Sequence, residues 1–210
     1  MNNNFCKIFL IIFLRYALFS YGQEAAEEFY ADGKLKAKGE IKNGLKEGKW
    51  IYYYPNGVIN SILFYLQGDL HGTCEYFDFQ GKLQTVETWQ HGVLEGEAKE
   101  YYPNGQVKKE GVYKNDLYEG VWLFYYADGK IRQKGTYKNG LPHGEWEIYN
   151  EKGILVQKGS YLNGKEEGLW QFFDDQGKIQ LEGNFSNGMR VGEWFKYSPK
   201  GKKKPFRYKN

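Results

Sequence analysis

The 210-residue sequence predicts an all-β fold: an elongated single-sheet antiparallel β-meander built from about seven 24-residue hairpin repeats. The first observation is an internal repeat, because glycines recur every 24 residues without insertion or deletion over about 170 residues. The second is composition, since 19% aromatic residues and 27 glycines against five prolines suit sheets and turns. The third is a period-two alternation of apolar and charged residues, which is typical of half-buried strands.

The first 22 residues have the layout of a secretory signal peptide. Lys7 precedes an apolar run over residues 8–19, and Ser20 and Gly22 precede a plausible cleavage site before Gln23. The run is too short and too interrupted for a good membrane span, although an uncleaved N-terminal membrane anchor is the alternative. We therefore expect residues 1–22 to be removed and the protein to be exported, to a periplasmic, outer-envelope-associated or secreted location.

Residues 23–201 are predicted to form the repeat array, with two turns and two short strands in each unit. One turn signal is Asn-Gly, as in residues 138–141, and the other is of the Pro-Asn-Gly type, as in residues 54–57. Such dipeptides favour positive φ and tight hairpins. In the strand 33–42, Leu35 and Ala37 face one side and the lysines between them face the other. At about 4.8 Å per strand, seven units make a rod roughly 70 Å long.

Glycine and tryptophan occur in linked pairs, eleven residues apart. In two repeats the glycine is missing, at Leu63 and Glu87, and eleven residues later stand Cys74 and Ala98 instead of tryptophan. A large ring can cover the bare backbone of a glycine on the neighbouring strand, shielding its hydrogen bonds and restoring packing. The predicted structural pairs are Gly39 with Trp50, Gly111 with Trp122, Gly135 with Trp146, Gly159 with Trp170, and Gly183 with Trp194.

The hairpin register is predicted to within one residue. If the two-residue loop is 44–45, with glycine first as in a type II′ turn, Gly39 lies directly opposite Trp50 and Ile41 opposite Gly48. If the loop starts one residue earlier, glycine and tryptophan become diagonal neighbours. Either way the pairing is between adjacent strands.

Residues 202–210 form a basic C-terminal tail. From Lys196 onward the chain has seven cations and no acidic residue, whereas the repeat body is net negative. A segment of this kind is either simply solvated or contacts an anionic partner or membrane surface.

The pattern YKNGLPHGEWEIYNEKG (137–153) resembles the MORN repeat, in the variant form common in bacterial proteins that are often labelled YwqK-type antitoxins. The resemblance covers residues 29 to about 201, because the glycine and aromatic positions recur in register. It implies an elongated antiparallel meander and a scaffold or binding role, and it supplies no catalytic residues.

The sequence indicates no reaction centre. His71 and His143 share one repeat position but lie three units apart, about 30 Å by the strand spacing, so they cannot bind one metal ion. His91 is in a turn, and we interpret all three histidines as polar surface residues. Adjacent acids such as 174–175 lie at turns, where carboxylates are ordinarily solvated. We expect no enzyme, no cofactor and no metal site.

The function that these observations favour is that of an exported, non-enzymatic repeat protein acting as a protein-interaction scaffold for a protein partner or envelope component. The best candidate surface is the irregular second and third units, residues 61–72 and 85–96, where the glycine–tryptophan pairs are lost. The candidate partner-binding residues are Leu63, Phe64, Glu87 and Trp89. Drift after duplication explains these residues equally well.

Two alternatives stay open. One is an antitoxin-type protein that neutralises a cognate toxin by direct binding. The other is a cell-wall or carbohydrate-binding module, in which a row of aromatic residues offers stacking surfaces. That row either closes the core of the sheet or is exposed for binding, and it comprises Tyr53, Phe77, Tyr101, Tyr125, Tyr149, Phe173 and Tyr197. No nucleic-acid partner is expected, because acidic residues interleave with the lysines.

Overall fold

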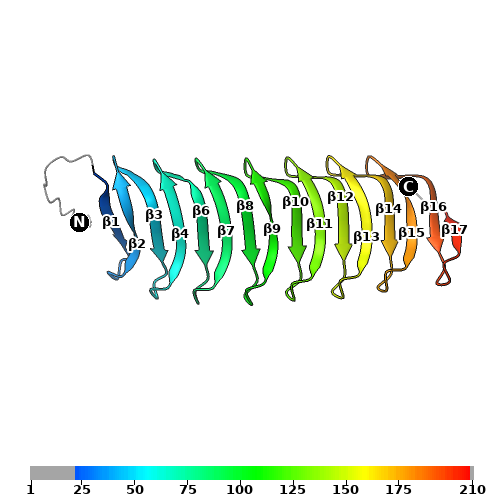
Figure 1. The fold of residues 1–210 in the computed structure, drawn as a ribbon, viewed down its shortest axis with the longest axis horizontal. Helices are drawn as coiled ribbons and strands as arrows, with labels where there is room; N and C mark the ends of the chain where they lie inside the picture. Colours follow the sequence, from blue (N-terminus) through cyan, green and yellow to red (C-terminus); the bar gives the residue numbers. More distant parts are fainter. Residues whose placement is uncertain (1–21, 209–210) are drawn as a thin grey trace, which may run out of the picture.

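The computed structural model describes residues 22–208, which form one layer of β-strands arranged as a rod (Figure 1). The predicted signal segment therefore lies outside the described residues, apart from Gly22. The strands are β1 (Glu24–Phe29), β2 (Leu35–Lys42), β3 (Leu45–Tyr53), β4 (Ile59–Leu66), β5 (Asp69–Leu70), β6 (Gly72–Phe77), β7 (Leu83–Gln90), β8 (Val93–Tyr101), β9 (Val107–Lys114), β10 (Leu117–Tyr125), β11 (Ile131–Lys138), β12 (Leu141–Tyr149), β13 (Leu155–Leu162), β14 (Lys165–Phe173), β15 (Ile179–Ser186), β16 (Met189–Tyr197) and β17 (Lys203–Phe206).

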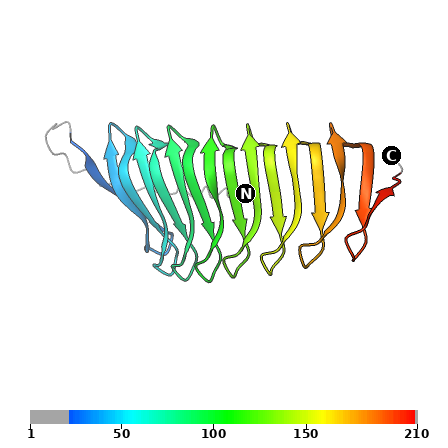
Figure 2. The same cartoon turned by 45° about the vertical axis from the view of Figure 1, so that its right-hand side comes forward.

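The predicted fold class is confirmed, because the 17 strands form a single open antiparallel sheet in which chain neighbours pair with each other. The strands arch across the rod and the hairpin turns line its two long edges (Figure 2). Strands β5 and β6 both pair with β4 and are two parts of one interrupted strand. Within residues 22–208 there is no helix, and so none that is long and apolar enough to cross a membrane.

The Asn-Gly turns correct the favoured register. Asn43 and Gly44 have φ angles of 54° and 78°, so the loop is a type I′ turn at 43–44 and not a type II′ turn at 44–45. Next to the loop, Ile41 therefore pairs with Lys46 and not with Gly48. The register differs in the same way in later hairpins, where Tyr113 faces Tyr118 and Tyr137 faces Pro142.

A bulge then restores the glycine–tryptophan alignment. In the hairpin of β11 and β12, Tyr137 pairs with Pro142 but Gly135 pairs with Trp146, so the second strand contains two extra residues. Gly144, with φ of 86°, lies within this bulge and adopts the left-handed conformation that glycine tolerates best. Both registers considered from the sequence thus occur in one hairpin, on either side of the bulge.

Each of the five paired tryptophans lies against the backbone of the preceding strand. A Cβ atom added to Gly159 would overlap the ring of Trp170, and the same holds at Gly39, Gly111 and Gly183. Four indoles also donate their Nε1 hydrogen to a backbone carbonyl beside that glycine: Trp50 to Glu40, Trp122 to Val112, Trp170 to Ser160 and Trp194 to Asn184, at 3.0–3.2 Å. Trp146 is turned differently and meets Gly135 through Cε3 and Cζ3.

The outer surface of several indoles is covered by the side chain four residues earlier, which the bulge folds back over the ring. Tyr118 stacks on Trp122 with ring centroids 3.8 Å apart. Lys46 Nζ lies 4.1 Å from the Trp50 ring centroid, and Arg190 has the same place over Trp194. Trp50 and Trp122 are consequently fully buried although the sheet has no second layer. The buried apolar positions are Ala37, Trp50, Cys74, Ala98, Trp122, Trp146, Trp170 and Trp194, which we call the tryptophan column.

The sheet continues past residue 201 into the segment that the sequence assigns to a tail. Strand β17 pairs with β16, placing Phe206 opposite Trp194. Lys203 forms an ion pair with Glu182 at 2.8 Å. Hydrogen bonds from Lys203 and Tyr197 hold the pKa of Glu182 down to about 2.

The space above each paired glycine, which the indole ring fills, is called the glycine recess. Gly159→Ala is predicted to lower the free energy of unfolding by about 1–3 kcal/mol, the usual cost of overpacking a core. The added methyl group would push the Trp170 ring off the backbone. Urea unfolding followed by tryptophan fluorescence measures the loss. Ser160→Ala, one residue along the same strand, is the control and should change stability little, and equal losses in the two variants would contradict the recess.

Candidate functional site

The tryptophan column is interrupted in the middle of the array. Trp50 lies opposite Leu63, Cys74 opposite Glu87, Glu87 opposite Ala98, and Ala98 opposite Gly111. In these units the small residues Cys74 and Ala98 replace tryptophan, and the larger residues Leu63 and Glu87 replace glycine. Cys74 is fully buried, and burial raises the pKa of its thiol. The column is therefore continuous in space but loses its indoles over β6 to β9.

A cavity of about 70 Å³ lies where Ala98 stands in place of an indole. It is lined by Thr85, Glu87, Ala98, Lys99, Glu100, Lys109, Tyr113 and Trp122. The walls combine two aromatic rings, two acids and two amines. A volume of this size holds about two water molecules or the tip of one side chain.

Of the two carboxylates that line this cavity, Glu87 and Glu100, only Glu100 forms ion pairs. The Glu87 side chain is half-buried, and burial raises the pKa of the carboxyl although the Lys109 charge opposes the shift. Lys109 itself forms an ion pair with Glu100 at 3.3 Å and a hydrogen bond to the Tyr118 hydroxyl at 3.1 Å. Within residues 22–208 no cation lies at ion-pair distance from Glu87. The cavity thus presents a partly desolvated carboxylate beside aromatic rings.

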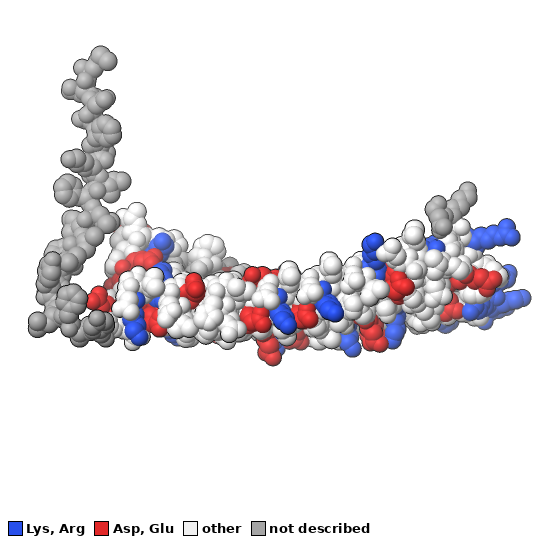
Figure 3. All heavy atoms as spheres, turned by 90° about the horizontal axis from the view of Figure 1, so that it is seen from above, with Lys and Arg blue, Asp and Glu red and all other residues white. Residues whose placement is uncertain are grey.

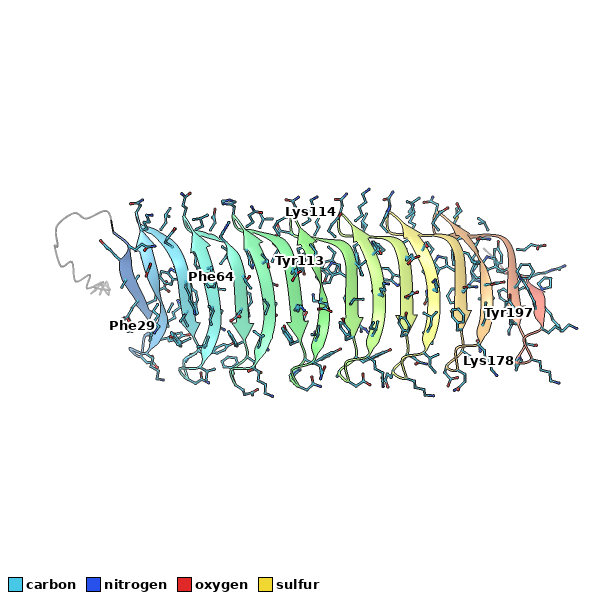
Figure 4. The ribbon with its side chains drawn as sticks, in the orientation of Figure 1. Phe29, Phe64, Tyr113, Lys114, Lys178 and Tyr197 are labelled. Atoms are coloured by element: carbon cyan, nitrogen blue, oxygen red, sulfur yellow. The ribbon has the colours of Figure 1, made fainter. Side chains whose placement is uncertain are left out.

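The four candidate partner-binding residues are divided between the two faces of the sheet. Leu63, Glu87 and Trp89 are on the face of the tryptophan column, which we call the tryptophan face. Phe64 follows Leu63 and so points to the other face, where it is 37% exposed and lies opposite Lys49 (Figure 4). The Nε1 atom of Trp89 is buried without a hydrogen-bond partner among the described residues. The structure therefore brings three of the four to one surface.

Sequence reasoning missed two parts of this surface. It did not identify Lys109 and Tyr113, which reach the cavity from β9. It also missed the covering residue four positions before each tryptophan. The sequence did contain a signal for these covering residues. Positions 46, 118 and 190 are separated by multiples of the 24-residue repeat, although their residue types differ.

The histidines occupy a structural position whose role is visible in the other repeats. There, a glutamate accepts a backbone N–H from the next Asn-Gly turn: Glu47 from Gln67, Glu95 from Asn115, Glu119 from Asn139 and Glu167 from Asn187, at 2.8–3.0 Å. His71 and His143 replace this glutamate, and each has a buried Nδ1 without a partner in the described chain. They are therefore half-buried and not simple surface residues.

The structure brings His71 near His91, with ring centroids 5.1 Å apart. Among residues 22–208, however, no group of three or more histidine, cysteine or acidic side chains is arranged to hold a metal ion. The pair is a contact between neighbouring turns.

The aromatic row from Tyr53 to Tyr197 lies on the opposite face from the tryptophans. Tyr125 donates a hydrogen bond to Glu110 and Tyr149 to Glu147, and the row is half-buried, whereas the tryptophan column forms the core. Burial, and then hydrogen bonding to these glutamates, raise the pKa of Tyr125 and of Tyr149 to about 12. The sequence left open whether the row closes the core or is exposed for binding. In the structure the row does not close the core.

Three recesses recur along this row, each beside a turn that contains proline. Their volumes are about 490, 450 and 340 Å³. Each is lined by a tyrosine of the row, a proline, an aliphatic residue and a lysine: Tyr53, Pro55, Leu35 and Lys34; Tyr101, Pro103, Leu83 and Lys82; Tyr197, Pro199, Ile179 and Lys178. Lys178 and Tyr197 lie close together near the C-terminal end of the rod (Figure 4).

Comparison with known proteins gives a family match over more than half of the chain. The model of the MORN repeat variant matches residues 25–43, 46–67, 94–115, 118–139, 142–163 and 166–187. The model of the MORN repeat matches residues 134–145 and 182–193. The segment 68–93 is unmatched, although β5, β6 and β7 continue the sheet there. Six segments are therefore matched, and the unmatched segment between them contains Cys74, Glu87 and Trp89.

None of the curated proteins matches this chain. Solved structures do match, including a crystal structure of a protein of unknown function from Bacteroides fragilis NCTC 9343. It is 8% identical, with 89% of this chain and 91% of that chain covered and a TM-score of 0.11.

The histidine position generates a stability prediction. His143→Glu should raise the free energy of unfolding by about 0.5–1.5 kcal/mol, because a carboxylate would accept the Asn163 N–H as its counterparts do in other repeats. Urea unfolding at neutral pH measures the gain. His143→Gln, which offers a neutral acceptor of similar length, should give a smaller gain, and destabilisation by both variants would contradict the assignment.

Proposed function

Because the chain belongs to the MORN repeat variant family, we propose that it is an exported, non-enzymatic repeat protein that binds a partner protein at the interruption of its tryptophan column. MORN repeat proteins are generally non-enzymatic and often mediate binding. The observation that carries the proposal is the cavity at Ala98, with a half-buried carboxylate that has no cation of its own.

The chemistry of the cavity favours a basic side chain of the partner. A lysine or arginine tip would pair with Glu87 and lie beside the Tyr113 ring, because aromatic rings attract cations through their π faces. A charged pair that forms away from water is the kind of contact that dominates an interface. Trp89 would extend the contact on the same face.

A repair experiment tests this site. Glu87→Gly combined with Ala98→Trp restores a glycine–tryptophan pair, fills the cavity and removes the carboxylate, so it should keep the fold while abolishing recovery of the partner from envelope extract. Partner recovery is measured by pull-down with the wild-type and repaired chains, and folding by circular dichroism.

The matched control is the same repair one unit earlier, Leu63→Gly with Cys74→Trp, which leaves Glu87 and Ala98 in place. It should retain the partner. Equal recovery by both repaired chains would contradict the proposal, as would equal loss.

Export is the second part of the proposal and rests on the signal layout of residues 1–22. The mass of the purified mature protein is the relevant measurement. A start near Gln23 would support processing for export, and a start at Met1 would oppose it.

The antitoxin form of the proposal takes a toxin as the partner. It requires that both proteins meet in one compartment. Co-expression with a toxic neighbouring gene product should show rescue by the wild-type chain and loss of rescue by the Glu87→Gly, Ala98→Trp chain.

Carbohydrate binding is the second candidate, and the three tyrosine–proline recesses favour it. Ring faces bind the apolar side of sugars, and a lysine beside each tyrosine could contact an anionic substituent. Replacing Tyr53, Tyr101 and Tyr197 with alanine should abolish pull-down on cell-wall fragments. Replacing Tyr125 and Tyr149, which stand at turns without proline, is the control and should leave such binding intact.

A further inference from the structure

The two ends of the rod are open sheet edges that can continue one another. Strand β1 pairs only with β2, and β17 only with β16, among the described residues. Since β5 and β6 are one interrupted strand, the sheet has an even number of strand positions, and its two edge strands run in opposite directions. A second copy shifted along the rod would therefore place its β1 antiparallel to β17, with both tryptophan faces on the same side.

The two edges carry opposite charge. Strand β1 contains Glu24, Glu27 and Glu28 and no basic residue. The segment 200–208 contains Lys200, Lys202, Lys203, Lys204 and Arg207 and no acidic residue. Blue cations gather at the C-terminal end of the rod, whereas acids are spread along its length (Figure 3). Like edges would repel each other, whereas unlike edges attract.

We propose that the protein assembles end to end, with β17 of one copy pairing with β1 of the next copy to form a longer continuous rod. This assembly goes beyond partner binding and does not depend on it. A contact between two different surfaces of one chain generates an open linear array and not a closed ring when the operation is a shift.

The tryptophan column suggests the register. Within one chain the column ends with Trp194 opposite Phe206, and it begins with Ala26 opposite Gly39. Placing Phe206 opposite Ala26 of the next copy continues the alternation of large and small residues. In that register Lys204 lies opposite Glu28 of the next copy, as an opposite-charge cross-strand pair.

Lysine and proline on an edge strand also act to prevent edge pairing, so Pro205 and its lysine neighbours have a competing role. In that case the chain would stay monomeric. The charge of β1 decides between the two roles. The lysines repel a second basic edge, whereas they attract the acidic edge that β1 presents.

Disulfide trapping tests the assembly in the full chain. Glu28→Cys with Lys204→Cys places two thiols at opposite ends of a rod roughly 70 Å long, so they can join only between copies. Directly opposed antiparallel residues have the Cα separation that a disulfide needs. The double variant should give a ladder of dimers, trimers and longer species on a non-reducing gel, and reducing agent should collapse it.

Each single-cysteine variant is the control, because one new thiol can join two copies at most; Cys74 is buried, and a Cys6→Ser background removes the remaining thiol. Reversing Lys202, Lys203 and Lys204 to glutamate should abolish the multimers of the wild-type chain in sedimentation at low salt. Adding Glu24→Lys and Glu27→Lys should restore them. A double-cysteine variant that stays monomeric or stops at the dimer would overturn the proposal, as would multimers that survive the lysine reversal.

Discussion

A tryptophan ring lying on the bare backbone of a glycine is the contact on which this structure depends. A single sheet has no second layer against which to bury apolar side chains, so its core must be built on one face. Each indole buries itself against the adjacent strand. It fills the space above Gly159 or Gly183 and donates its N–H to a neighbouring carbonyl. Over Trp194, the side chain of Arg190 from the same strand covers the outer surface of the ring. Because each contact joins only adjacent strands, the rod can extend without a central core.

The same contact explains the backbone geometry of the repeat. A type I′ loop sets one register, and the bulge at the second glycine adds two residues to the following strand. Without this bulge, Trp146 would not face Gly135. The second glycine of every repeat is therefore required by backbone conformation, whereas the strand glycine is required by the space that an indole occupies.

Sequence reasoning predicted the meander and the identity of the stacked pairs, because period, glycine position and ring size are properties of single strands. It failed where the result depends on several strands together. The bulge changes the facing partner of Tyr137, and the covering residues are of different types, two cations at Lys46 and Arg190 and an aromatic ring at Tyr118. The cavity beside Ala98 needs Lys109 and Tyr113 from the next strands, and the face on which Phe64 lies follows from the observed register. The interruption of the column was visible in the sequence, but its shape and unpaired carboxylate were not.

A double-mutant cycle on Gly111 and Trp122 tests the central contact most directly, with Gly111→Ala, Trp122→Ala and the combined chain compared by urea unfolding. If the ring occupies the glycine recess, Gly111→Ala should be costly in the wild-type chain and nearly neutral once the indole is gone, giving a coupling energy of about 1–3 kcal/mol. Losses that add within about 0.5 kcal/mol would show that the two residues act independently, and they would contradict the account.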